Sequence, residues 1–253
     1  MKDVAGLSVL ITGGGSGIGA GTAEYFCERG ARVTVCGRRR NEVDAVAARL
    51  GKNCRGVQAD VTSDADRRRL VAAAIEHGGG LDALVNNAGN MYRGPIHSLD
   101  ERQLLDVFHS NVVAGMMLTG LCVEALSQSA GAVVFIGSIH NRLAFPGASP
   151  YAATKGAVET LTRVLAAELG REKVRVNCVA PGAVLTELNQ RAGLVSDEEA
   201  RARLESMIDR HALDRIGTEQ DVAEAIAYLV CADWTTGAVI DVDGGLGLGV
   251  TET

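Results

Sequence analysis

Apolar and polar positions along the chain alternate between two periods. Seven short runs, each five or six residues long and mostly apolar, predict buried strands at residues 7–11, 31–36, 55–59, 81–85, 131–136, 174–179 and 238–242. Between them, apolar residues recur with helical spacing in residues 18–29, 42–50, 63–77, 98–126, 151–169, 196–210 and 220–229. This alternation of strands and helices predicts an α/β fold in which helices cover both faces of a parallel sheet.

Signals at the ends of the helices refine these ranges. Gly30 has the position of a helix C-cap. Three serines precede an acidic residue with the spacing of a capping box: Ser63 with Asp66, Ser98 with Glu101, and Ser196 with Glu199. Because the chain has no internal repeat, low-complexity segment or linker, we expect one domain that spans residues 1–253.

A glycine-rich loop joins the first predicted strand to the first helix. In the sequence Thr12-Gly13-Gly14-Gly15-Ser16-Gly17-Ile18-Gly19, glycines 13, 17 and 19 would permit a tight turn, a close approach of the backbone and close helix–strand packing. The start of the helix then offers unpaired N–H groups and a positive dipole end to a pyrophosphate. The spacing differs from G-x-G-x-x-G, and no Lys-Ser/Thr follows, which disfavours a Walker-type nucleotide loop. A merely flexible turn is the alternative.

Tyr151 and Lys155 stand four residues apart in a predicted helix, so they share one of its faces. Free tyrosine has a pKa near ~10, which is too high for a base at neutral pH. A neighbouring cation favours the phenolate, and we therefore expect Lys155 to lower the pKa of Tyr151 toward neutral pH. Such a pair can act as a general acid or base, although Tyr and Lys also meet by chance on helix surfaces.

Further short motifs run in order along nearly the whole chain. They are Asp60-Val61, Asn86-Asn87-Ala88-Gly89, Asn111, Ser138, and Pro181-Gly182, and Ser138 lies thirteen residues before Tyr151. With the glycine loop and the Tyr–Lys pair, this set resembles the short-chain dehydrogenase/reductase family, in particular its 3-oxoacyl-carrier-protein reductase-like and sugar or polyol dehydrogenase-like branches. The resemblance implies a Rossmann-like, doubly wound, seven-stranded parallel sheet in three α/β/α layers. It also implies hydride transfer between NAD(P) and a carbonyl or secondary alcohol.

The resemblance assigns a catalytic role to four residues. Ser138 would hydrogen-bond the substrate oxygen, and Tyr151 would pass the proton to or from it. Lys155 would hold the nicotinamide ribose and lower the pKa of Tyr151. Asn111 would support a helix bend and a water that leads to Lys155; without the resemblance, it would be interpreted as a satisfied buried polar group.

The residues implied to bind the cofactor lie mostly where predicted strands end. They are Gly13, Ser16, Gly17, Ile18, Gly19, Arg38, Arg39, Asp60, Val61, Asn87, Ala88, Gly89, Tyr151, Lys155, Pro181, Gly182, Val184 and Thr186. Asp60 and Val61 would meet the adenine, residues 87–89 the adenosine and ribose, and residues 181–186 the nicotinamide amide and pyrophosphate. Without the resemblance, many of these positions would be ordinary turns at strand ends.

Two arginines favour NADP over NAD. NAD-preferring relatives carry an acidic residue at the end of the second strand, and this position falls on Gly37, followed by Arg38 and Arg39. Without that carboxylate a 2′-phosphate meets no repulsion, and a guanidinium can bind it with two hydrogen bonds. NAD remains the alternative cofactor.

Two segments are expected to determine the substrate. The first is residues 139–150, where His140 and Asn141 would lie near the reacting oxygen. The implied substrate-binding residues are Ser138, His140 and Tyr151, and stabilisation of the loop is the alternative role for His140 and Asn141. The second segment is a lid at residues 187–215, which mixes apolar and charged residues and could exclude water. Neither segment identifies the substrate, its stereochemistry or the direction of the reaction.

Composition narrows the remaining classes. A net charge of −6 disfavours a nucleic-acid binder, and the apolar runs are too short and interrupted to suggest a membrane span. Six scattered cysteines show no metal-ligand spacing, so we expect no metal, and they suit a reducing, cytoplasmic setting. The chain would act on a small-molecule carbonyl or alcohol, and by resemblance as a homo-oligomer, in particular a tetramer. The alternatives are an NAD-dependent sugar, polyol or other alcohol dehydrogenase and a catalytically silent cofactor-binding regulatory protein.

Overall fold

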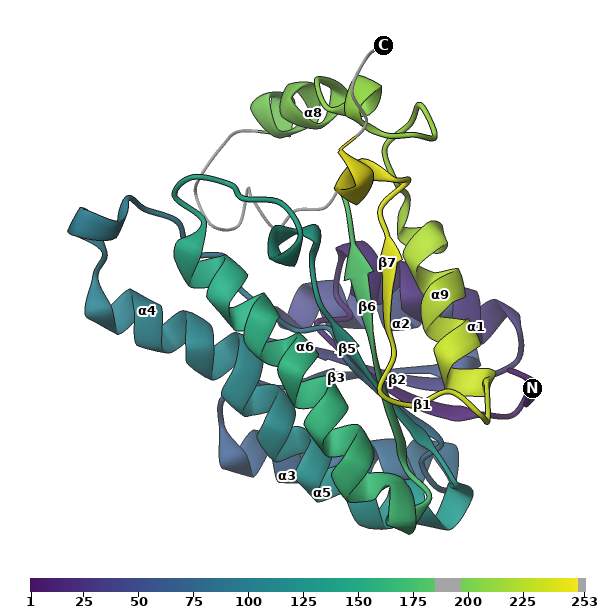
Figure 1. The fold of residues 1–253 in the computed structure, drawn as a ribbon. Coiled ribbons are helices and arrows are strands. Elements are labelled where there is room, and N and C mark those ends of the chain that lie inside the picture. The colour runs from purple at the N-terminus through teal and green to yellow at the C-terminus, as the bar shows by residue number, and fades with distance from the viewer. Residues whose placement is uncertain (185–196, 250–253) are drawn as a thin grey trace.

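The computed structural model describes residues 1–184 and 197–249 and contains one seven-stranded parallel sheet (Figure 1). The strands lie in the order β3-β2-β1-β4-β5-β6-β7. Their bounds are β1 (Ser8–Thr12), β2 (Arg32–Gly37), β3 (Cys54–Gln58), β4 (Ala83–Asn86), β5 (Ala132–Ile136), β6 (Arg175–Pro181) and β7 (Val239–Val242). The order reverses direction between β1 and β4, which is the switch point where ligands of such sheets bind.

Helices cover both faces of the sheet and give the predicted Rossmann-like three-layer fold. They are α1 (Gly17–Glu28), α2 (Arg40–Leu50), α3 (Asp64–Gly78), α4 (Glu101–Phe108), α5 (Ala114–Ser129), α6 (Ser149–Leu169), α8 (Asp197–Glu205) and α9 (Glu219–Cys231). Successive residues of a strand point to opposite faces, so Val9 and Ile11 of β1 pack with α1 and α9, whereas Leu10 packs with α3 and α5.

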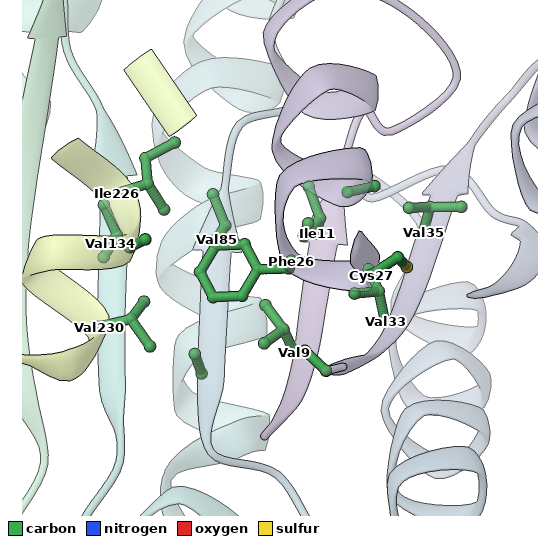
Figure 2. Close-up of a cluster of buried hydrophobic side chains, with 14 of the residues drawn as sticks. Val9, Ile11, Phe26, Cys27, Val33, Val35, Val85, Val134, Ile226 and Val230 are labelled. Atoms are coloured by element: carbon green, nitrogen blue, oxygen red, sulfur yellow. The ribbon is translucent and has the colours of Figure 1, made fainter. Parts of the chain in front are cut away.

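The core on the α1 side is centred on Phe26, which is completely buried (Figure 2). Val9, Ile11 and Val85 of the sheet and Ile226 of α9 belong to the same cluster. Removing a side chain of this size from water contributes about 2–3 kcal/mol to folding. The cluster anchors α1, and therefore the glycine loop that precedes it, to the centre of the sheet.

Two helix starts differ from the sequence predictions. Ser98 does not cap the helix that follows it; Asp100 does, because its carboxylate accepts the Gln103 N–H at 2.9 Å. The predicted capping box at Ser63 is half formed. Ser63 accepts the Asp66 N–H at 3.3 Å, but the Asp66 carboxylate accepts the Asp60 N–H instead of returning to Ser63.

Other boundaries also shift. The predicted helix 98–126 is divided into α4 and α5 by a π-helical turn, His109–Val113. Helix α6 begins two residues before Tyr151, with Pro150 in its first turn, where a missing N–H is harmless. A capping box of Thr218 and Asp221 starts α9 and was not predicted. The expected box at Ser196 lies outside the described residues.

The segment Glu101–Ser129 is long and apolar enough to cross a membrane by length and composition alone. It is the only such helix in the part of the chain that the structure describes. Its residues Leu118, Cys122 and Leu126 belong to the core between α5 and the sheet, which explains their apolar character without a bilayer.

Candidate active site

A cavity of about 600 Å³ lies at the carboxyl edge of the sheet, within the usual range for small-molecule sites. It extends from the glycine loop to Tyr151 and Lys155, and α8 lies over the carboxyl ends of β6 and β7 (Figure 1). Eighteen of the predicted site residues line it: Gly13, Ser16, Gly17, Ile18, Arg38, Arg39, Asp60, Val61, Asn87, Ala88, Gly89, Ser138, His140, Tyr151, Lys155, Pro181, Gly182 and Val184. Of the other three, Gly19 and Asn111 are not among the lining residues, and Thr186 lies outside the described residues.

The glycine loop leaves no room for a side chain at Gly13 or Gly19. Gly13 has φ of +66°, and a Cβ there would lie 3.0 Å from the Cα of Ala88. A Cβ on Gly19 would lie 2.5 Å from Asn87 Nδ2 and against the carbonyl oxygen of Gly13. Gly19 therefore allows α1 to pack closely behind the loop, whereas Gly13 allows the turn itself.

Thr12 and Asn87 hold this loop against the end of β4. Asn87 Nδ2 donates to the carbonyl oxygens of Thr12 and Gly13 at 2.8 and 3.2 Å. The Thr12 hydroxyl accepts the N–H groups of Asn87 and Ala88 at 3.0 and 2.9 Å. The Asn87 side chain, predicted to bind the cofactor, thus contributes by fixing the backbone that faces the cavity.

The end of the cavity near β2 combines two arginines with an acid. Arg38 Nη2 lies 3.4 Å from Asn90 Oδ1, and Arg39 Nη2 donates to the Ser16 hydroxyl at 3.2 Å. Glu42 Oε1 lies 3.8 Å from Arg39 Nη1 and also lines the cavity. An anionic group bound here would meet guanidinium groups with one carboxylate beside them.

Ser138, Tyr151 and Lys155 come together at the other end. Ser138 follows β5 by one intervening residue, and α6 presents Tyr151 and Lys155 on one buried face. Lys155 Nζ donates to the Ile136 carbonyl oxygen at 2.7 Å and lies 5.5 Å from the centre of the Tyr151 ring. The structure therefore groups the predicted acid/base, its serine and its lysine within one small volume.

The pKa of Tyr151 shifts in the direction opposite to the prediction. Burial raises the pKa of Tyr151 to about 12, and the nearby Ser138 hydroxyl lowers it by less than burial raises it. Burial also lowers the pKa of Lys155 to about 8. Desolvation disfavours both charged forms, so the expectation that Lys155 brings Tyr151 toward neutral pH is wrong for this structure.

His140 contacts the side chains of both Ser138 and Tyr151. Its Nδ1 lies 3.1 Å from the Ser138 hydroxyl, and its ring packs edge-on against Tyr151 with ring centres 5.1 Å apart. The ring also packs against Phe145, with ring centres 4.3 Å apart. The structure therefore places His140 beside Ser138 and Tyr151.

Asn111 lies in the π-helical turn, behind the cavity. Its amide binds the backbone of Asn90 in both directions, donating to the carbonyl oxygen at 2.9 Å and accepting the N–H at 2.7 Å. It also donates to the Thr154 hydroxyl at 3.0 Å, and Thr154 precedes Lys155 on α6. Asn111 thus connects the loop after β4 to α6.

An ion-pair cluster holds the loop that follows His140. Arg142 binds Glu159 of α6 at 3.0 Å and Asp241 of β7 at 3.3 Å. Glu159 lies two turns after Tyr151 and is 6% exposed. Among the residues that the structure describes, its Oε1 and both side-chain polar atoms of Asn141 are buried and have no hydrogen-bond partner.

Sequence reasoning missed several lining residues. They are chiefly Gly15, Glu42, Met91, Arg93, Phe145, Leu204, Met207 and Leu246. Phe145 lies in the predicted substrate loop, and Leu204 and Met207 lie in the predicted lid. The sequence therefore indicated their segments, although not these residues individually. Met91 and Leu246 had none, because an apolar residue in a loop looks the same whether it faces a cavity or a core. Among the described residues, no three His, Cys, Asp or Glu side chains are grouped to hold a metal.

Comparisons with known proteins agree with this geometry. Residues 13–247 match the sequence model of the family described as enoyl-(acyl carrier protein) reductase. The chain is 36% identical to a glucose 1-dehydrogenase of Gluconobacter oxydans, over 96% of this chain and 93% of that protein. It is 37% identical to an L-fucose dehydrogenase of Bos taurus, over 97% of this chain and 91% of that protein. A solved short-chain dehydrogenase/reductase of unknown function from Caenorhabditis elegans, determined with cofactor, has a TM-score of 0.91 and 25% identity and covers 98% of both chains. This chain therefore belongs to the short-chain dehydrogenase/reductase family of NAD(P)-dependent oxidoreductases.

Proposed function

We propose that the protein is an NADP-dependent oxidoreductase that interconverts a carbonyl and a secondary alcohol on a small molecule. The observation that carries this proposal is the grouping of Ser138, Tyr151 and Lys155 in the same cavity as the glycine loop. Sugar and polyol alcohols fit the names of the glucose and fucose dehydrogenases to which the chain is similar. Polar groups at the reacting end, including His140, suit a hydroxylated substrate.

The cavity suits a dinucleotide by its shape. The tight approach at Gly13 and Gly19 leaves backbone N–H groups at the start of α1 accessible to a pyrophosphate. Asp60 and Val61 would border the adenine, Lys155 the nicotinamide ribose, and Pro181, Gly182, Val184 and Thr186 the nicotinamide end. When bound, the nicotinamide accepts or delivers the hydride. Arg38 and Arg39 support a preference for NADP, with NAD as the alternative.

Tyr151 supplies the proton in this proposal. A phenol with a pKa of about 12 is protonated at neutral pH and is ready to donate from Oη to a carbonyl oxygen that gains negative charge. Ser138 would hold the same oxygen with a hydrogen bond. In the opposite direction Tyr151 must act as a base, so alcohol oxidation should become faster as the pH rises. Asn111 would act indirectly, by positioning α6 and the water path predicted to lead to Lys155.

The experiment is a panel of carbonyls and alcohols, followed by NADPH absorbance, with Tyr151→Phe as the control. We expect the substitution to reduce turnover by about 10²- to 10⁴-fold while NADPH still binds. Turnover that persists in Tyr151→Phe would refute the acid/base assignment. NADPH binding without turnover of any substrate by the wild-type protein would favour a silent cofactor-binding protein instead.

The setting of the enzyme is also part of the proposal. We place it in the cytoplasm as a single domain spanning 1–253 that assembles as a homotetramer. Exposed apolar residues on α4, α5 and α6, such as Leu105, Met116 and Val164, support assembly because they would otherwise face water. Sedimentation of the purified protein tests this, and a monomer at micromolar concentration would contradict it.

A further inference from the structure

Among the described residues, Ser138, Phe145 and Tyr151 contact the His140 side chain. Its ring lies nearly perpendicular to that of Tyr151 and tilted against that of Phe145, with ring centres 5.1 and 4.3 Å away. On the third side, Ser138 Oγ lies 3.1 Å from Nδ1 and also accepts the backbone N–H of His140 at 3.3 Å. A ring fixed in this way presents Nδ1 to Ser138 in one orientation.

The proton on Nδ1 decides what Ser138 can do. A serine hydroxyl has one hydrogen to donate and two lone pairs to accept with. If Nδ1 carries no proton, the Ser138 hydrogen is drawn to Nδ1 and is lost to the substrate. If Nδ1 carries a proton, Ser138 accepts from Nδ1–H and from the backbone N–H, and its hydrogen is left to point elsewhere in the cavity.

We propose that His140 is a positioning residue whose Nδ1–H donates to Ser138 Oγ and thereby turns the Ser138 hydrogen toward the substrate oxygen. The inference rests on the proposed function, in which Ser138 hydrogen-bonds that oxygen. It differs from the direct substrate contact predicted from the sequence, because Nδ1 is used by Ser138. A donor oriented before the reaction need not reorganise as charge develops, so the effect belongs to kcat.

Three substitutions separate the two nitrogens of the ring. Asn places an amide N–H near the position of Nδ1, Gln places one near Nε2, and Phe keeps the ring packing against Tyr151 and Phe145 without a donor. We expect His140→Phe to lower kcat by about 10- to 100-fold with little change in KM, less than the loss of a direct oxyanion donor. His140→Asn should recover much of this loss and His140→Gln should not. NADPH affinity, measured by fluorescence titration, should stay unchanged in all three.

Two further measurements make the test independent of folding and of the reaction. In a Ser138→Ala background, His140→Phe should cause no additional loss, because its route to the substrate is gone. Long-range ¹H–¹⁵N NMR of wild-type His140 should show the proton on Nδ1, whether or not a substrate is known. A proton found only on Nε2, or unchanged kcat in His140→Phe, would overturn the proposal. Rescue by Gln but not Asn, with the effect in KM, would establish a direct substrate contact instead. Failure of the wild-type protein to turn over any substrate would refute the proposed function and leave the NMR result to judge His140.

Discussion

The wall of the cavity beside the glycine loop and the wall that carries Tyr151 are built from different parts of the chain. The first, the glycine wall, is lined by residues 13, 15–18 and 87–89 and presents mostly backbone, which the side chains of Thr12 and Asn87 hold in place. The second, the side-chain wall, presents the side chains of Ser138, His140 and Tyr151, which are in mutual contact, together with Lys155. The two walls should therefore respond differently to substitution.

The difference follows from what each wall has to bind. A pyrophosphate is bound by N–H groups that every residue except proline has, so the first wall needs a shape and selects glycine for space. In the proposed function the second wall transfers a proton, which requires specific groups with specific pKa values, so this wall needs particular side chains. On the first wall one added methyl group should be severe, whereas on the second the chemistry of the replacement should decide the outcome.

The largest expected effect comes from one methyl group added directly behind the glycine wall. In Gly19→Ala, the new Cβ would collide with Asn87 and with the carbonyl oxygen of Gly13. Because one of these neighbours is backbone, we expect NADPH affinity to fall by at least about 100-fold, or about 3 kcal/mol. Fluorescence titration measures this. The matched control is Gly170→Ala, where a Cβ meets nothing within 4 Å and binding should not change. Equal affinities in the two variants would remove the distinction between the walls.

Buried Lys155, on the side-chain wall, should make the free energy of unfolding depend on pH. Burial lowers the pKa of Lys155 to about 8, against ~10.4 in an unfolded chain. The folded protein therefore binds fewer protons than the unfolded one above pH 8, and its stability should rise with pH there. Relative to Lys155→Met, we expect the wild-type protein to gain about 1.5 kcal/mol between pH 8 and about pH 9.5, below the range where Tyr151 contributes.

Urea unfolding of both proteins across this range measures the gain. Replacement of the exposed Lys52 by Met should keep the wild-type pH slope. Parallel pH curves for wild type and Lys155→Met would show that the buried cation does not carry the predicted cost.

Arg38 lines the cavity beside the glycine wall, and its side chain is proposed to bind the cofactor. A smaller effect is expected there. Arg38→Asp, with Gly37 retained, places a carboxylate where we propose that the 2′-phosphate binds. We expect the NADPH/NADH preference to fall by about tenfold, because a favourable charge pair becomes a repulsive one. The ratio of the two dissociation constants measures it. Arg40→Asp has the same change of charge outside the cavity lining and should leave the ratio as it is. An unchanged ratio in Arg38→Asp would sink the NADP assignment.

The smallest effect lies outside both walls and serves as a reference. Asp100→Ala removes the carboxylate that accepts the Gln103 N–H at the start of α4, and should lower the free energy of unfolding by about 1 kcal/mol. Ser98→Ala, at the residue that the sequence pattern favoured as the cap, should change it by less than about 0.5 kcal/mol. Urea unfolding measures both, and kcat should not change in either variant. A larger loss in Ser98→Ala than in Asp100→Ala would show that Ser98, and not Asp100, is the cap that stabilises this helix start.

The fold was predictable because its signals are local and repeated. Each strand is a short apolar run, and each strand–helix unit restricts how the next one packs, so errors at single boundaries did not change the architecture. The predicted helix start at Ser98 was wrong because Ser98 and Asp100 are both residue types that can cap a helix, and only packing selects between them. A prediction of the fold therefore remains right when several helix or strand boundaries are wrong, whereas a prediction of a site does not.

The order and spacing of the motifs along the chain were enough to identify the family and to place Ser138, Tyr151 and Lys155 in one site. The spacing of motifs at strand ends predicts which residues lie close together, because the parallel sheet brings the ends of its strands to one edge. It does not record how deeply those residues are buried. Burial depends on every segment packed above Tyr151, and it reversed the expected direction of that pKa. The contact between His140 and Ser138 also emerged only in three dimensions, since it depends on how Phe145 and Tyr151 enclose the ring.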